Sequence, residues 1–340
     1  MKAVTIFPYF EALIHSFCIQ GLRSSFGTKS IRYSTDGFPR FGSSGFLKFI
    51  VHGKMDRRVF IDHWDLPDLD ALGLAWCDVY AKINIDPNLV PENYAPKIIP
   101  TGPIFPVRPY CLIPTLYHAL ETSCLSAKSS RDYFDYNRIR GHFANWYGQI
   151  KYAPPQHAYE PGVSTKNYIF FPSSLWKNAI ETNVSRALFI EACLSITGIR
   201  FEGGFTPKNQ KKTYEAMSTL QWINDILTLN SYRKTKASAV VFITPAVARC
   251  LSWRLGEYLA LGKAIVATSI ERLLPAPLIH GKHIHYVEAS LESIKSAVQL
   301  ICQDDAYRRK LEQGAREYYL EYLSPPLVMS RILKAAESLE

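Results

Sequence analysis

The sequence predicts an α/β protein with two doubly wound units, each a parallel sheet with helices on both faces. Short β-branched apolar runs alternate along the chain with stretches whose apolar residues recur at helical spacing. The 340 residues, 47% of them hydrophobic, suffice for two cores of ordinary size. A linker rich in Pro and Gly at 152–162 separates the two periodic regions. We therefore predict domains at 1–155 and 156–325, followed by a closing helix at 326–340.

In the first half, short strands alternate with two helical stretches. The segment 11–26 has Leu13, Phe17 and Leu22 at helical spacing and is followed by Gly27, so it predicts a helix. No Gly-x-Gly-x-x-Gly follows the first strand, which argues against a dinucleotide cofactor. The predicted strands are 4–7, 30–34, 46–51, 58–62, 79–84 and 97–100, and a second helix is predicted at 72–77.

The second half has the same alternation. Gly203 and Gly204 follow its second strand and predict a tight strand-to-loop turn, with a cradle for a ligand as the weaker alternative. Predicted strands lie at 167–171, 199–201, 240–243 and 264–268, and predicted helices at 186–193, 252–261, 304–321 and 327–339.

One strand–helix–strand unit of this half carries the clearest functional signal. Ser252 is a suitable N-cap for a helix that contains Arg254 and Glu257 and ends at Gly262. In an open parallel sheet, the start of such a helix shares with the strand ends the edge where ligands bind, and its free N–H groups attract anions. Arg254 can add a forked contact to phosphate, and Glu257 can accept hydrogen bonds from sugar hydroxyls. The same spacing also fits a surface Arg–Glu pair, worth only a few tenths of a kcal/mol.

The segment from Glu257 to Thr268, Glu-Tyr-Leu-Ala-Leu-Gly-Lys-Ala-Ile-Val-Ala-Thr, resembles the C-terminal signature of GT-B glycosyltransferases, in particular family 4. The Arg-x-x-Glu pair of Arg254 and Glu257 is also similar to exostosin-type members. The resemblance implies two domains facing a cleft, the first binding an acceptor and the second a nucleotide-sugar. It also implies that the closing helix packs on the first domain. Finally, it implies that Glu257 binds the ribose of the donor and Arg254 its diphosphate.

Around this pair we predict a set of donor-binding residues. One member departs from the resemblance, because family 4 enzymes usually carry a glutamate eight positions before Glu257 that contacts the donor sugar, and this sequence has Arg249. The identity of the sugar and the stereochemical course therefore stay open. The predicted donor-binding residues are Glu257, Gly256, Leu255, Ser252, Arg249, Thr244, Gly204 and Thr268.

Three polar residues, Asp62, His63 and Asp65, stand at the end of the predicted strand 58–62, where binding groups collect in such sheets. A carboxylate or an imidazole there can deprotonate an acceptor hydroxyl, which contributes about 10²–10⁴-fold to the rate. Polar loop residues that cap the next helix explain the same pattern. We predict Arg254, Asp62 and His63 as the catalytic residues.

Composition agrees with this class of protein. Seven scattered cysteines, none in Cys-x-x-Cys spacing, indicate reduced and mostly buried thiols in a cytoplasmic protein. His280, His283 and His285 lack an acidic companion at metal spacing, so we expect neither a metal site nor a cofactor other than the donor.

The formal net charge of +9 fits a diphosphate donor and an anionic membrane surface, and the basic residues form no runs typical of nucleic-acid binding. The stretch 131–147 mixes Arg with Tyr, Phe and Trp, a composition typical of a patch on lipid headgroups or on a lipid-linked acceptor. A partly buried helix hairpin is the alternative for this stretch.

Together these observations predict a glycosyltransferase of the hexosyltransferase type. It would transfer a sugar from a nucleotide-diphosphate sugar to a glycan or lipid-linked saccharide in surface polysaccharide biosynthesis, without an obligatory metal. Its expected location is the cytoplasm, in peripheral contact with the inner face of the cytoplasmic membrane. The alternatives are a non-catalytic α/β binding or scaffold protein that kept this fold, and a sugar-nucleotide epimerase of the same fold.

Overall fold

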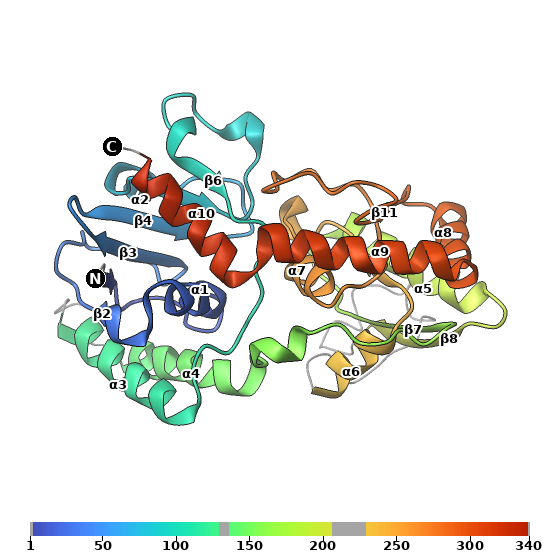
Figure 1. Ribbon diagram of the computed structural model, residues 1–340, viewed down its shortest axis with the longest axis horizontal. Helices are drawn as coiled ribbons and strands as arrows, with labels where there is room; N and C mark the ends of the chain where they lie inside the picture. The colour runs from blue at the N-terminus through green and yellow to red at the C-terminus, as the bar shows by residue number, and fades with distance from the viewer. Residues whose placement is uncertain (1–2, 129–135, 206–228, 339–340) are drawn as a thin grey trace. The chain divides into compact units, whose positions relative to one another are not determined.

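The computed structural model describes residues 3–128, 136–205 and 229–338 (Figure 1). The chain divides into two compact units. The first comprises Met1–Gln156, Leu273–Pro275 and Tyr322–Glu340, and the second comprises His157–Arg272 and Ala276–Glu321. Each unit contains strands and helices arranged as α/β structure, so the predicted fold class is confirmed.

The first unit holds a six-stranded sheet in the order β2-β1-β3-β4-β5-β6. Neighbouring strands pair in parallel except at β3, which runs antiparallel to both β1 and β4. The sheet is therefore mixed rather than wholly parallel as predicted, because the short segment 53–56 joins β3 to β4 as a hairpin and leaves no room for a crossover helix. The strands are β1 (Ala3–Ile6), β2 (Ile31–Tyr33), β3 (Phe46–His52), β4 (Arg57–Asp62), β5 (Val79–Lys82) and β6 (Ile98–Pro100).

The helices of the first unit include α1 (Ser16–Phe26), which packs along the closing helix α10 (Pro325–Glu337). A Cβ on Gly21 of α1 would lie 2.4 Å from the carbonyl oxygen of Pro325, so a glycine is required where these helices meet. A shorter helix, α2 (Ala71–Trp76), follows β4.

Two further helices of this unit, α3 (Leu112–Lys128) and α4 (Tyr136–Tyr152), pack against each other as a hairpin. Residues 136–147 of the predicted stretch 131–147 belong to α4, as the helix-hairpin alternative expects. Residues 131–135 lie outside the described residues. No helix in the described part of the chain is long and apolar enough to cross a membrane.

The strands of the second unit are β7 (Tyr168–Ser173), β8 (Arg200–Phe205), β9 (Val241–Ile243), β10 (Ile265–Ala267) and β11 (His285–Tyr286). The pair β7-β8 and the ladder β11-β10-β9 are both parallel. The amide of Ala239 donates to the carbonyl of Tyr168 at 2.7 Å, so β9 begins beside β7 and the strands follow the order β8-β7-β9-β10-β11. This order reverses between β7 and β9, and open α/β sheets bind ligands at such a point, at the carboxyl ends of the strands.

Helices cover the sheet of the second unit on both faces. On one face, α5 (Ile180–Ser195) and α8 (Leu291–Gln303) share a core with alternate strand residues such as Ile169, Phe242 and Val266. The helix α7 (Trp253–Ala260), which connects β9 to β10, packs instead against β9 and against α9 (Asp305–Tyr318). The helix α6 (Leu229–Ala237) packs on β7.

The glycine pair of this unit does not form the predicted turn. Gly203 and Gly204 lie within β8, where they pair with Phe171 and Pro172 of β7. A Cβ on Gly203 would lie 2.4 Å from the carbonyl oxygen of Phe171. Glycine is therefore needed because the two strands approach closely, and not because the chain reverses.

Candidate functional site

The carboxyl ends of β9 and β10 bring several of the predicted donor-binding residues together. Thr268, after β10, donates from Oγ1 to Oγ1 of Thr244, after β9, at 3.1 Å. Ser252 caps α7 as predicted, and its hydroxyl accepts from the amide of Arg254 at 3.3 Å. A small hollow at this edge is lined by Ile243, Thr244, Pro245, Arg249, Cys250, Leu251, Ser252, Leu255, Ile270 and Glu271. Four predicted residues, Thr244, Arg249, Ser252 and Leu255, thus share one wall.

The Arg254–Glu257 pair is largely buried, unlike a surface pair at the same spacing. The side chain of Glu257 is 1% exposed and that of Arg254 16%, and Nη1 of Arg254 donates to Oε2 of Glu257 at 3.3 Å. Oε1 of Glu257 accepts from the hydroxyl of Tyr232 at 2.7 Å and from that of Tyr159 at 3.5 Å. Every carboxylate oxygen of Glu257 is therefore already engaged. Ribose binding by Glu257 stays a prediction, and it would use the acceptor capacity that these three hydrogen bonds leave on the carboxylate.

Burial affects the pKa values of both Glu257 and Arg254. Burial raises the pKa of Glu257, although the Arg254 guanidinium and the two tyrosine hydroxyls oppose the shift. Burial also disfavours the charge of Arg254, but the Glu257 carboxylate and the neighbouring tyrosines raise its pKa overall. Arg254 is thus a fixed positive charge, which Glu257 and Ser252 hold at the start of α7.

A second arginine, which the sequence analysis does not single out, lies near this point. Arg186, in the second turn of α5, donates from Nη1 to the carbonyl of Ser174, just after β7, at 2.7 Å. Burial, with a further contribution from the Arg254 guanidinium, lowers the pKa of Arg186 to about 10. Thr182, in the first turn of the same helix, donates to the carbonyl of Pro245 at 2.8 Å, so α5 begins beside the end of β9. Two guanidinium groups, one from α5 and one from α7, therefore lie near enough for the charge of Arg254 to act on Arg186, close to the point where the strand order reverses.

The loop before α7 is strained. Ala248 and Arg249 both have positive φ, 54° and 57°, which is unfavourable for residues other than glycine. Arg272 donates to the carbonyl of Ala248 at 2.8 Å, and Nη1 of Arg249 donates to Glu271 at 2.9 and 3.0 Å. These contacts with the segment after β10 hold the Arg249 guanidinium, which is half exposed, at the rim of the small hollow.

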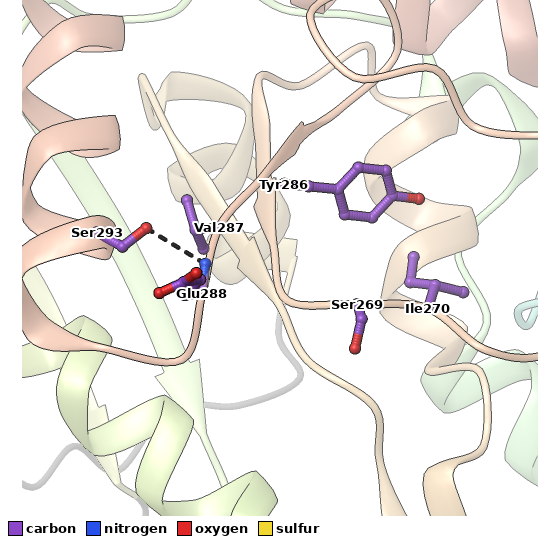
Figure 2. Close-up of a pocket in the computed structure, with 6 residues that line it drawn as sticks. All are labelled: Ser269, Ile270, Tyr286, Val287, Glu288 and Ser293. Carbon is purple, nitrogen blue, oxygen red and sulfur yellow. Dashed lines mark hydrogen bonds between the residues drawn. The ribbon is translucent and has the colours of Figure 1, made fainter.

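A larger, open hollow of about 700 Å³ lies at the ends of β10 and β11. Figure 2 shows Glu288 and Ser293 on one side of it and Tyr286, Ser269 and Ile270 on the other. The amide of Glu288 donates to the Ser293 hydroxyl at 3.2 Å, which ties this rim to the first turn of α8. Hydroxyls and one carboxylate thus surround a space large enough for a small polar ligand.

Two predicted donor-binding residues lie away from the hollows. Gly256 is buried within α7, and Gly204 is buried within β8 opposite Pro172. Neither lines the small hollow at β9 or the larger hollow at β10 and β11.

In the first unit, Asp62 is buried at the end of β4, with an exposed fraction of 1%. Its Oδ2 accepts from Nζ of Lys82 at 2.6 Å and from the Tyr80 hydroxyl at 2.7 Å, and its Oδ1 accepts from the amide of Trp64 at 2.9 Å. Three protein donors therefore already occupy most of the acceptor sites that this carboxylate could direct at a substrate hydroxyl.

His63 stacks on the buried His15, with 4.0 Å between the ring centroids. Its Nε2 lies 3.8 Å from Sγ of Cys18, and its Nδ1 has no hydrogen-bond partner among the described residues. Burial, together with the Lys82 charge, lowers the pKa of His63 to about 3. Burial, with the neighbouring His63 and Lys48, lowers the pKa of His15 well below its usual value. Asp65 is exposed.

These neutral histidines predict acid sensitivity of the first unit. The unfolded chain binds a proton at each histidine near pH 6.5 and the folded unit does not, so stability is complete above pH 6.5 and is lost as the pH falls towards the folded pKa. We expect His63 to contribute about 1.4 kcal/mol of this loss per pH unit between pH 6 and pH 4. Urea unfolding of the wild type and of His63→Gln over this range measures it.

The matched control is His157→Gln, which replaces an exposed histidine and should leave the pH dependence unchanged. A His63→Gln variant with the wild-type pH dependence would contradict the assignment of a neutral, buried imidazole.

The three histidines near β11 make structural contacts. Nδ1 of His280 accepts from the amide of Tyr286 at 3.0 Å, and Nδ1 of His283 accepts from the amide of Ile279 at 3.1 Å. Nδ1 of His285 lies 2.7 Å from the Tyr307 hydroxyl. Within the described ranges, no three His, Cys, Asp or Glu residues are grouped as metal ligands.

No protein-family model matches the chain, and no curated protein matches it. Among solved structures it is similar to a glycosyltransferase from Rickettsia africae, with 12% identity and a TM-score of 0.44 over 82% of this chain and 70% of that one. It is also similar to sucrose-phosphate synthase from Thermosynechococcus elongatus, with 12% identity and a TM-score of 0.42 over 76% of this chain and 88% of that one. A Listeria monocytogenes protein described as a UDP-N-acetylglucosamine 2-epimerase has 12% identity and a TM-score of 0.39 over 79% of this chain and 61% of that one. The neighbours thus include glycosyltransferases, the class that the segment 257–268 resembles, and the exostosin-type likeness stays a prediction.

Proposed function

We propose that the second unit binds a nucleotide-diphosphate sugar and that the protein is a glycosyltransferase of the hexosyltransferase type. The observation that carries the proposal is the pair of guanidinium groups, Arg186 of α5 and Arg254 of α7, at the point where the strand order reverses. Like charges at a partly buried point oppose each other, so this arrangement favours an anion with more than one negative charge. A diphosphate meets that requirement, and the start of α7 adds N–H donors.

In the proposed reaction, the bond between the anomeric carbon of the donor and the diphosphate oxygen breaks, and a bond to an acceptor oxygen forms. Arg186 and Arg254 would stabilise the negative charge that develops on the leaving diphosphate. Because two guanidinium groups supply this positive charge, we propose that no metal is obligatory. Glu257 would act chiefly by holding Arg254 in place.

The hydroxyl-rich hollow of Figure 2 is the proposed place for sugar or ribose hydroxyls, with Glu288 as an acceptor. The acceptor is proposed to be a glycan or lipid-linked saccharide of a surface polysaccharide, bound by the first unit. The acceptor proton would pass to Asp62 or His63 in the predicted assignment. The chain would act in the cytoplasm at the inner face of the membrane, for which the net charge of +9 is the supporting observation.

The melting temperature of the whole chain against UDP, GDP, ADP and CMP tests the donor site. A nucleotide at about 100 times its Kd adds roughly 2.7 kcal/mol to stability. We expect selective stabilisation by one nucleoside diphosphate, undiminished in EDTA. No shift with any nucleotide would contradict the proposal and favour a non-catalytic scaffold.

The matching nucleotide-sugar then separates the remaining alternatives. Slow release of the unchanged sugar without an acceptor indicates a transferase. Release of an altered sugar indicates a sugar-nucleotide epimerase.

A further inference from the structure

The helix α3 carries its apolar side chains outward. Its buried positions are the small or polar residues Thr115, Ala119, Thr122 and Ser123. Its exposed positions are large and apolar, with exposed fractions from 38% to 79%: Leu112, Ile113, Leu116, Tyr117 and Leu120. The helix is thus inverted relative to an ordinary amphipathic helix, whose apolar face packs on the core.

The helix α4, which packs against α3, has an exposed stripe of its own. Arg140, Phe143, Tyr147 and Lys151 are spaced three, four and four residues apart, so they form one stripe along the helix, and all four are exposed. Trp146, on the opposite side, is fully buried. The exposed stripe therefore alternates cations with aromatic rings.

The sequence of the two helices has more basic than acidic residues. Glu121 is the only acidic residue in the sequence of α3 and α4, and it lies 3.1 Å from Nδ1 of His118. Against it stand four basic residues in the sequence of the two helices, Lys128, Arg138, Arg140 and Lys151. Among the described side chains, the exposed Arg140 and Lys151 give this apolar surface a positive charge.

We propose that this outward surface of α3 and α4 lies on an anionic membrane, with α3 in the plane of the interface. Leucine, isoleucine and tyrosine side chains enter the boundary between headgroups and acyl chains, while flanking arginine and lysine bind anionic headgroups. Neither helix crosses the bilayer. A twofold contact between two copies through this surface would place one positive stripe against another, so charge favours an anionic lipid surface over self-association. The inference stands whether or not the second unit binds a nucleotide-sugar.

Cosedimentation of the full chain with vesicles tests the proposal. The vesicles are phosphatidylcholine alone, or phosphatidylcholine with an equal amount of phosphatidylglycerol. We expect binding to the anionic vesicles that weakens at high salt, and at least tenfold weaker binding for Ile113→Ser/Leu120→Ser and for Arg140→Ala/Lys151→Ala. The matched control is Met55→Ser/Val163→Ser, which removes two equally exposed apolar side chains elsewhere and should bind like the wild type.

A fluorophore that reports polarity, attached to the exposed Cys124 on α3 in a Cys111→Ser background, should shift to the blue with anionic vesicles. If the wild type binds neither kind of vesicle, the proposal is overturned. Equal binding of the anionic vesicles by Ile113→Ser/Leu120→Ser and the wild type would also overturn it. Sedimentation equilibrium tests the other occupant. If the wild type is a dimer that Ile113→Ser/Leu120→Ser dissociates, and it binds no vesicles, the surface contacts a second copy instead. Because nucleotide binding is measured separately by melting, failure here leaves the donor site untouched.

Discussion

Replacing Arg186 by alanine is expected to weaken binding of the stabilising nucleoside diphosphate by about 10- to 150-fold. A hydrogen bond to a charged group is worth about 1.5–3 kcal/mol, and Arg186 is one of two guanidinium groups proposed to hold the diphosphate. Arg186 donates to the backbone carbonyl of Ser174 and forms no ion pair with a carboxylate among the described residues, so the variant leaves no buried carboxylate without a partner. Isothermal titration of the wild type and of the variant measures the change.

Arg309→Ala is the matched control, because Arg309 is an exposed arginine of the same unit. It should bind the nucleotide as the wild type does. Unchanged affinity in Arg186→Ala would remove the observation on which the donor site depends.

Arg254 is a less direct test of the same site. Its removal strips the buried Glu257 carboxylate of its cation, which costs about 3–5 kcal/mol of stability by itself. Loss of binding in Arg254→Ala is informative only in a variant that also carries Glu257→Gln, where the buried charge is gone.

The sequence predicts the local parts of this site well. Ser252 as an N-cap, the helix through Arg254 and Glu257 and its end at Gly262 all follow from capping and spacing within about ten residues. Arg186 could not be found in this way, because its proposed role depends on the nearby charge of Arg254, which lies on a different helix 68 residues later in the sequence. A signal did exist: Arg186 falls in the second turn of the helix that follows the first strand of its unit.

The same distinction explains the residues of the first unit. The sequence places Asp62 correctly at the end of a strand, but its partner Lys82 is twenty residues later and meets it only through the register of β4 with β5. The antiparallel direction of β3, by contrast, could have been predicted, because the predicted strands 46–51 and 58–62 are only six residues apart, too few for a crossover helix. Local pattern fixes which elements form, whereas the charge partners of a residue depend on register.

Replacing Lys82 by methionine is expected to lower the free energy of unfolding by about 3–5 kcal/mol. The change leaves the Asp62 carboxylate buried, with only the Tyr80 hydroxyl and the Trp64 amide as donors. Lys82→Met combined with Asp62→Asn should recover much of the loss, because the unpaired charge is removed. Urea unfolding of these two variants measures the change. The control, Arg58→Met, breaks the more exposed pair of Arg58 and Asp78 and should cost at most about 1 kcal/mol.

These variants also decide what Asp62 does. If Asp62 is a general base, Asp62→Asn should lose about 10²–10⁴-fold in kcat once a donor and an acceptor are in hand, even where the double variant restores stability. If Asp62 only anchors Lys82 in the sheet, the double variant should recover activity together with stability. The three hydrogen bonds to a carboxylate that is 1% exposed favour the second outcome, which would move the proton-accepting role away from Asp62.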